Sequence, residues 1–168
     1  MSESPRRLVL CIGNPDCGDD GVGRLVACLL RGRVPTDVLV SECHGGAGEV
    51  LDRITGVDSA ILVDAAVSGV PAGTIHRVDC AAGEAVPAPR VASSHGLGVA
   101  EAIALARTLG CLPRSCVIYA VEAKRFAPGD ELSPEVTHAT REVAERVLLL
   151  LRGARNQDGL DMRDPSPA

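Results

Sequence analysis

The chain has almost no aromatic side chains. Trp is absent, and Tyr119 and Phe126 are the only aromatic residues among 168. Proteins that bind single-stranded nucleic acid stack the bases on aromatic rings, and this chain has too few rings for such a surface. Its net charge of −5 also argues against a surface that binds phosphates. We therefore expect no nucleic-acid partner.

Long apolar runs and paired cysteines are missing as well. No segment approaches the roughly 18 consecutive apolar residues of a membrane span, and Leu8–Ile12 is too short for a secretory signal. The seven cysteines include no C-x-x-C pair, the spacing typical of zinc ribbons. We expect a cytoplasmic protein with reduced thiols and no membrane partner.

Two cofactor and catalytic motifs are also lacking. The glycine-rich stretch at residues 13–18 has neither the G-x-G-x-x-G spacing nor the Lys-Ser/Thr of a Walker loop, so we expect no nucleotide cofactor. The G-x-S-x-G turn of serine hydrolases does not occur. A nucleotide-binding α/β domain remains a weak alternative.

Short apolar runs alternate with helical patterns along residues 8–152. Strands are expected at 8–12, 38–40, 60–63, 74–78 and 117–121, and helices after residues 20, 46, 94 and 133. This alternation predicts an α/β fold: a three-layer α/β/α domain with a five-stranded, mainly parallel twisted sheet and helices on both faces. Strand 74–78 has polar neighbours and is expected at an edge. We expect residues 1–7 to be flexible and residues 153–168 to form a disordered tail.

Acidic residues and a histidine follow the predicted apolar segments. Asp19 and Asp20 come after the first strand, Asp64 ends the third, and His95 starts a helix. Each has an ordinary structural explanation as a turn, cap or helix-dipole residue. Because parallel strands end at one edge of the sheet, Asp20 and Asp64 can also meet, and with His95 they would suit a divalent ion. Without a metal, two close carboxylates repel and one keeps its proton.

Glycines follow the second predicted strand. Gly45 and Gly46 either form a turn before a helix or allow a peptide backbone to approach closely, since glycine lacks Cβ. The preceding Cys43-His44 pair has the residue types of a metal or redox site, but we favour an ordinary loop.

Four segments resemble the nickel-iron hydrogenase maturation endopeptidases, over essentially the whole of residues 8–152. They are Ile12-Gly13-Asn14 with Gly18-Asp19-Asp20-Gly21-Val22-Gly23, Leu62-Val63-Asp64-Ala65, Ser93-Ser94-His95-Gly96-Leu97-Gly98, and Val117-Ile118-Tyr119-Ala120-Val121-Glu122. Relatives often have Asp-Gly-Gly where this chain has His44-Gly45-Gly46, which leaves the specificity of that loop open. Ala120 and Ala123 stand where relatives have glycine.

The resemblance implies a cytoplasmic protease, often classed as an aspartic-type endopeptidase. It would remove the C-terminal extension of a hydrogenase large-subunit precursor after nickel insertion. Asp20, Asp64 and His95 would bind the nickel that the precursor carries, Asp20 and Asp64 would be the catalytic residues, and Gly45 and Gly46 would contact the substrate.

Two mechanisms remain open from the sequence. The metal could polarise the scissile carbonyl or activate a water, or an aspartate could act as general base while the nickel serves only for recognition. A non-enzymatic metal-binding or chaperone module that binds nickel-loaded precursor is the alternative function.

Overall fold

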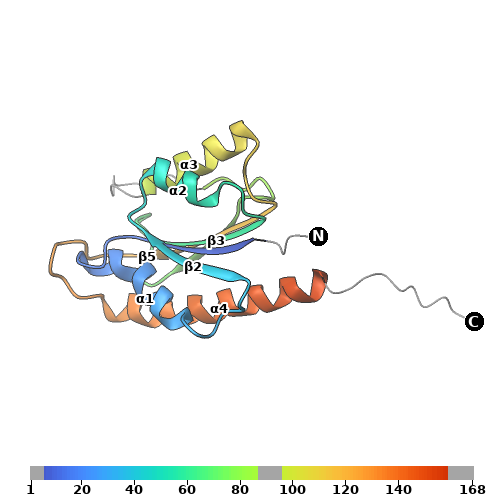
Figure 1. Ribbon diagram of the computed structural model, residues 1–168. Helices are drawn as coiled ribbons and strands as arrows, with labels where there is room; N and C mark the ends of the chain where they lie inside the picture. The colour runs from blue at the N-terminus through green and yellow to red at the C-terminus, as the bar shows by residue number, and fades with distance from the viewer. Residues whose placement is uncertain (1–5, 87–95, 159–168) are drawn as a thin grey trace, which may run out of the picture.

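The computed structural model describes residues 6–86 and 96–158, in which strands and helices alternate (Figure 1). The elements are, in chain order, β1 (Arg7–Ile12), the 3-10 helix η1 (Gly18–Gly21), α1 (Val22–Leu30), β2 (Val38–Cys43), α2 (Ala47–Ile54), β3 (Ser59–Ala66), β4 (Ile75–Asp79), α3 (Gly96–Leu109), β5 (Ser115–Glu122) and α4 (Pro134–Asp158).

The strands form one sheet in the order β2-β1-β3-β5-β4. β1 pairs in parallel with β2 and β3, and β3 pairs in parallel with β5. β4 is antiparallel to β5 and lies at the edge, as its polar neighbours predicted. The expected five-stranded, mainly parallel sheet is confirmed.

Helices cover both faces of the sheet, α2 and α3 on one and α1 and α4 on the other (Figure 1). β1 shows why: it is buried along its whole length, and its side chains alternate between two cores. Val9 and Cys11 belong to the core under α1 and α4, whereas Leu8, Leu10 and Ile12 belong to the core under α2 and α3. A strand buried on both faces reads as a continuous apolar run for this reason. The predicted three-layer fold is confirmed.

The first strand begins one residue earlier than predicted, at Arg7, which is buried rather than flexible. Its guanidinium pairs with Asp37 at 3.1 Å and donates to the carbonyl of Leu151 at the other end of the chain. An arginine stem can be buried when its charged head finds such partners. Residues 1–5 lie outside the described part of the chain.

The last helix continues to Asp158, beyond its predicted end near Arg152 and into the predicted tail of residues 153–168. The prediction rests on the apolar residues, which stop near Arg152. Extending an existing helix requires no burial, however, because each added residue gains a hydrogen bond without the cost of nucleation. Residues 159–168 lie outside the described part.

The buried stripe of α3 also differs from the prediction. The apolar pattern of residues 95–109 predicts that Val99, Ala100, Ile103, Ala104 and Leu109 are buried. The structure buries Val99, Ala102, Ile103 and Ala106 and leaves Leu109 65% exposed. Alanines occur on several sides of this helix, so the pattern alone did not decide which side faces the sheet.

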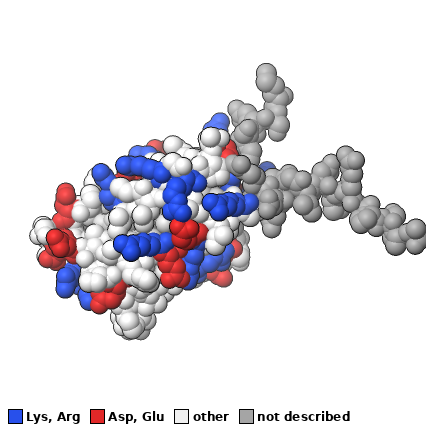
Figure 2. Space-filling model, turned by 90° about the horizontal axis from the view of Figure 1, so that it is seen from below, with Lys and Arg blue, Asp and Glu red and all other residues white. Residues whose placement is uncertain are grey.

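Charges of both signs are mixed on the face that carries α1 and α4 (Figure 2). Several form ion pairs, among them Arg33 with Glu145 at 2.7 Å, which joins the end of α1 to α4. Exposed pairs of this kind contribute about 0–1 kcal/mol each. In the described part of the chain, no helix is long and apolar enough to cross a membrane.

Candidate active site

The carboxyl ends of β1 and β3 lie side by side. The two strands are parallel neighbours, with Cys11 opposite Val63, so the loop after β1 and residue Asp64 lie at the same edge. Asp64 is inside β3, opposite Ala120 of β5, and does not end the strand as expected.

Asp64 is a buried acid with a perturbed pKa. Its side chain is 4% exposed, and its Oδ1 accepts a hydrogen bond from the Ala65 N–H at 2.8 Å. Burial above all raises the pKa of Asp64; the Ala65 N–H opposes this, the negative charge of Asp20 adds to it, and the result is a pKa of about 7. The two carboxylates therefore lie close enough to interact electrostatically.

Asp20 is held in the turn η1 and is also 4% exposed. Its Oδ2 accepts a hydrogen bond from the Asn14 N–H at 2.8 Å. Gly13, with φ of +134°, packs against the Asp20 backbone: a Cβ at Gly13 would lie 2.0 Å from the Asp20 carbonyl oxygen. The glycine before Asn14 is therefore needed for this loop to fold.

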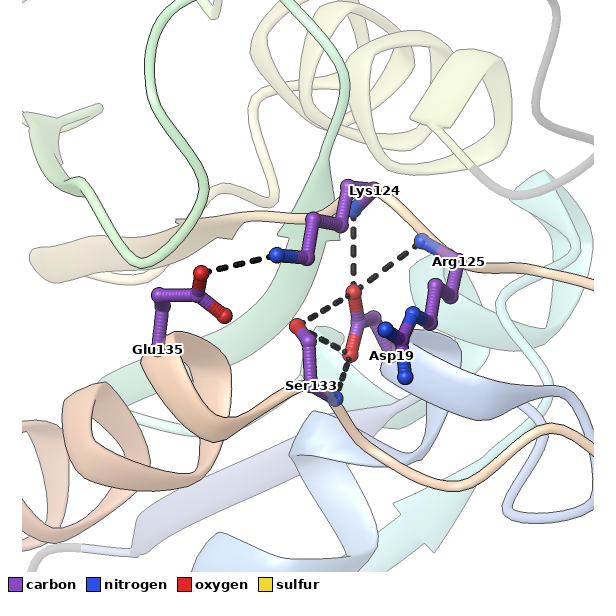
Figure 3. Close-up of polar contacts among 5 residues, drawn as sticks. All are labelled: Asp19, Lys124, Arg125, Ser133 and Glu135. Carbon is purple, nitrogen blue, oxygen red and sulfur yellow. Dashed lines mark hydrogen bonds and ion pairs between the residues drawn. The ribbon is translucent and has the colours of Figure 1, made fainter.

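Asp19, the neighbour of Asp20, is fully buried and has no access to the solvent. Its carboxylate accepts hydrogen bonds from the backbone N–H groups of Lys124, Arg125 and Ser133 at 2.6–3.1 Å and from the Ser133 hydroxyl at 2.9 Å (Figure 3). Burial alone would raise the pKa of Asp19, but these donors outweigh it and hold the pKa below its usual value. Asp19 therefore remains ionised.

From the sequence, Ser133 before Pro134 is predicted to be a helix cap, and no partner is predicted for Asp19. The Ser133 hydroxyl instead donates to Asp19, although its carbonyl accepts the Thr137 N–H at 2.9 Å, as in a helix start. The only signal in the sequence was the repeated acid, because two adjacent carboxylates require different surroundings if both are to be buried.

The Gly45-Gly46 loop lies against the first turn of α3. Gly45 is buried with φ of +99°, and a Cβ at Gly98 would lie 2.1 Å from the Gly45 carbonyl oxygen. The Gly13 N–H donates to the Cys43 carbonyl at 3.0 Å, which joins this loop to the one that leads to Asp20. Close backbone contacts thus bring the start of α3 next to the loops at the carboxyl edge.

His95 itself lies outside the described residues, since the description of α3 begins at Gly96. Within residues 6–86 and 96–158, no three His, Cys, Asp or Glu side chains are grouped so as to hold a metal ion. The structure therefore brings together Asp20 and Asp64 and places the helix after His95 nearby.

Cys43 and His44 do not form a reactive pair. Cys43 is buried, and burial above all raises the pKa of its thiol to about 11, with the charges of Glu49 and Asp64 contributing. His44 is exposed, and its N–H donates to Glu49 of α2 at 3.2 Å. A thiol with a raised pKa is a poor nucleophile and metal ligand, in agreement with the ordinary loop that we favoured.

Glu122 is a further buried acid at this edge, for which the sequence predicts no role. It ends β5 at 1% exposure and accepts hydrogen bonds from the N–H groups of Ser68 and Gly69, the Ser68 hydroxyl and His76. Burial raises the pKa of Glu122, but these donors lower it more, and the net shift is downward. Glu122 thus holds the connection between β3 and β4 through Ser68 and Gly69.

Comparisons with known proteins agree with this architecture. The model of the family described as hydrogenase maturation protease matches residues 29–149. The hydrogenase expression/formation protein HupD of Thiocapsa roseopersicina is 31% identical over 154 residues, covering 88% of this chain and 68% of HupD. The hydrogenase 2 maturation protease of Escherichia coli K12 is 32% identical over 152 residues, covering 88% and 91%.

A solved structure shows the same fold. The hydrogenase maturating endopeptidase HybD from E. coli superposes with a TM-score of 0.77 at 28% sequence identity, covering 89% of this chain and 93% of HybD. The family model covers well over half of the chain, and the relatives are similar along most of it. This chain therefore belongs to the hydrogenase maturation protease family and is a protease.

Proposed function

We propose that this protease removes the C-terminal extension of a [NiFe] hydrogenase large-subunit precursor after nickel insertion. Asp20, Asp64 and His95 recognise the nickel, which belongs to the substrate, and cleavage takes place in the cytoplasm. The relatives' names as hydrogenase maturation proteases support a hydrogenase precursor as the substrate.

The observation that carries the proposal is the buried pair of Asp64 and Asp20. Burial and the charge of Asp20 together raise the pKa of Asp64 to about 7, so the empty pair favours one proton. A divalent cation supplies the missing positive charge and lets both carboxylates ionise. The pair therefore gains more from a nickel-loaded precursor than from an empty one, which provides the selectivity.

In the metal-free site Asp64 has a pKa of about 7, near neutral pH. The substrate's cation lowers that pKa, so in the loaded complex Asp64 is ionised and able to accept a proton as a general base. In the proposed cleavage, water attacks the scissile carbonyl and one of the two aspartates accepts the water's proton. As the C–N bond breaks, that aspartate passes the proton to the leaving amine. The substrate's nickel supplies positive charge at the same edge of the sheet.

Gly46 supports a substrate-binding role for the loop after β2. It is exposed, and a Cβ placed on it meets none of the described atoms within 4 Å, so a peptide backbone can approach it. Gly45, by contrast, is buried against α3 and fixes the loop. We assign Gly46 to substrate contact and Gly45 to the support of that contact.

The test is the intact mass of a large-subunit precursor incubated with the protein, in its nickel-loaded and nickel-free forms. We expect shortening of the loaded precursor by the wild type and none by Asp64→Asn or His95→Ala. Asp52→Asn on α2 is the matched control, since Asp52 is exposed. It should process at the wild-type rate.

Three results would contradict the proposal or a part of it. A wild-type protein that binds the loaded precursor but leaves its mass unchanged would favour the chaperone function. Normal processing by both Asp64→Asn and His95→Ala would refute the site. Equal cleavage of loaded and nickel-free precursor would remove the nickel-recognition role.

A further inference from the structure

Asp19 and Asp20 are adjacent and buried, but their carboxylates have separate partners. The Asp19 carboxylate binds the segment 124–133, which connects β5 to α4. The Asp20 carboxylate accepts the Asn14 N–H and interacts with Asp64. Asp19 therefore binds the connecting segment, whereas Asp20 takes part in the candidate active site.

Backbone contacts also join the turn η1 to segment 124–133. The Asp19 N–H donates to the Arg125 carbonyl at 2.8 Å, and the Gly129 N–H donates to the Asp16 carbonyl at 2.8 Å. Gly18 has φ of +56°, and a Cβ there would lie 2.7 Å from the Arg125 carbonyl oxygen. Since no side chain fits between them at this point, the two segments are packed backbone to backbone.

The backbone of Asp20 is fixed between this contact and the end of β1. Its N–H donates to the Cys17 carbonyl at 3.1 Å, and its carbonyl packs on Gly13. The Asp20 carbonyl is already in close contact with Gly13, so there is little room on that side to take up a shift of Asp19. A shift of Asp19 would then be passed on to the Asp20 side chain.

We propose that Asp19 is a positioning residue: its hydrogen bonds to segment 124–133 set the place of the Asp20 carboxylate against Asp64. The consequence for cleavage rests on the proposed function, whereas the consequence for Asp20 itself does not. If Asp19 had only a structural role, its replacement would lower the free energy of unfolding but leave Asp20 and the turnover of the folded protein unchanged.

Asp19→Asn is the sharpest perturbation because it keeps the shape and changes one oxygen into an NH₂ donor. Oδ1 of Asp19 faces the Ser133 N–H, and Oδ2 faces the N–H groups of Lys124 and Arg125. In either orientation of the asparagine amide, its NH₂ group faces a backbone N–H group of segment 124–133. Two donors cannot bond to each other, so segment 124–133 has to move away.

Hydrogen exchange at the Asn14 amide reports the position of Asp20, because this N–H donates to the Asp20 carboxylate. In Asp19→Asn we expect about tenfold faster exchange at Asn14, the effect of losing one hydrogen bond to a charged group. Val63, within the central strand β3, should exchange as in the wild type, which excludes global unfolding as the cause.

Asp130→Asn is the matched control. Asp130 lies in the same segment, and its carboxylate accepts the N–H of Ala127, another residue of that segment, at 3.1 Å. It should leave Asn14 exchange unchanged. Should Asp19→Asn fail to fold, Ser133→Ala decides, because it removes only the hydroxyl donor; about threefold faster exchange is expected. An unchanged Asn14 rate in the folded variant would overturn the inference.

Kinetics then test the effect on cleavage. For Asp19→Asn we expect kcat to fall about a hundredfold with KM within about twofold of wild type, as for a misplaced catalytic group. Wild-type kcat in folded Asp19→Asn would also overturn the inference. If the wild type itself does not shorten the precursor, the proposed function fails, but the exchange experiment still decides whether Asp19 positions Asp20.

Discussion

In the metal-free protein, the stability of Asp64→Asn relative to the wild type should increase from acidic to alkaline pH. Asp64 is an acid whose pKa is raised by burial from 3.8 to about 7. The folded protein therefore keeps a proton that the unfolded chain loses above pH 4. Because the folded state binds more protons than the unfolded state between these values, stability falls as pH rises through this window.

The size of the effect follows from the two pKa values. The difference between the two pKa values destabilises the folded state by about 4 kcal/mol at pH 8 and by under about 2 kcal/mol at pH 5, at about 1.36 kcal/mol for each pKa unit. Asn does not titrate, and its own penalty for a buried amide is the same at both values of pH. The free energy of unfolding of Asp64→Asn minus that of the wild type should therefore increase by about 2.5 kcal/mol between pH 5 and pH 8.

Urea unfolding in the presence of a chelator measures this difference, since a bound cation would itself lower the pKa of Asp64. Asp52→Asn, an exposed acid on α2, is the control for the loss of one negative charge. Its stability difference from the wild type should not follow the same course. A difference for Asp64→Asn that stays constant within about 0.5 kcal/mol from pH 5 to pH 8 would refute the reasoning.

Three further substitutions test the contacts around the site. Gly98→Ala should lower the free energy of unfolding by about 1–3 kcal/mol in urea, because its Cβ would lie 2.1 Å from the Gly45 carbonyl oxygen. Gly46→Ala meets no described neighbour within 4 Å, so it should change stability by less than about 0.5 kcal/mol and instead raise KM for the precursor. Glu122→Gln should lower the free energy of unfolding by about 1–3 kcal/mol. Oε1 of Glu122 accepts the N–H groups of Ser68 and Gly69, and Oε2 accepts the Ser68 hydroxyl; in glutamine one of these two acceptors is replaced by an NH₂ donor. Equal stability of Gly98→Ala and Gly46→Ala, or wild-type stability of Glu122→Gln, would contradict these assignments.

The layers, the sheet and the place of Asp20 and Asp64 were accessible from the sequence because they depend on local patterns. Apolar runs such as Leu8–Ile12 mark strands buried on both faces, and the residues that follow them gather at one edge. The face of α3 and the end of α4 were not accessible. Alanine fits either a buried or an exposed position, and a helix continues beyond its packed part wherever nothing stops it.

The sequence by itself determined that this chain is a three-layer α/β protein with acids at the carboxyl edge of its sheet, and its motifs indicated the family. Only the tertiary structure decided which acid does what. Asp19 stays ionised because it meets donors more than 100 residues away along the chain, at Lys124, Arg125 and Ser133. Asp64 favours its proton because burial removes it from water beside Asp20. A pKa depends on the groups that surround a side chain in space, and the order of residues does not specify them before the chain folds.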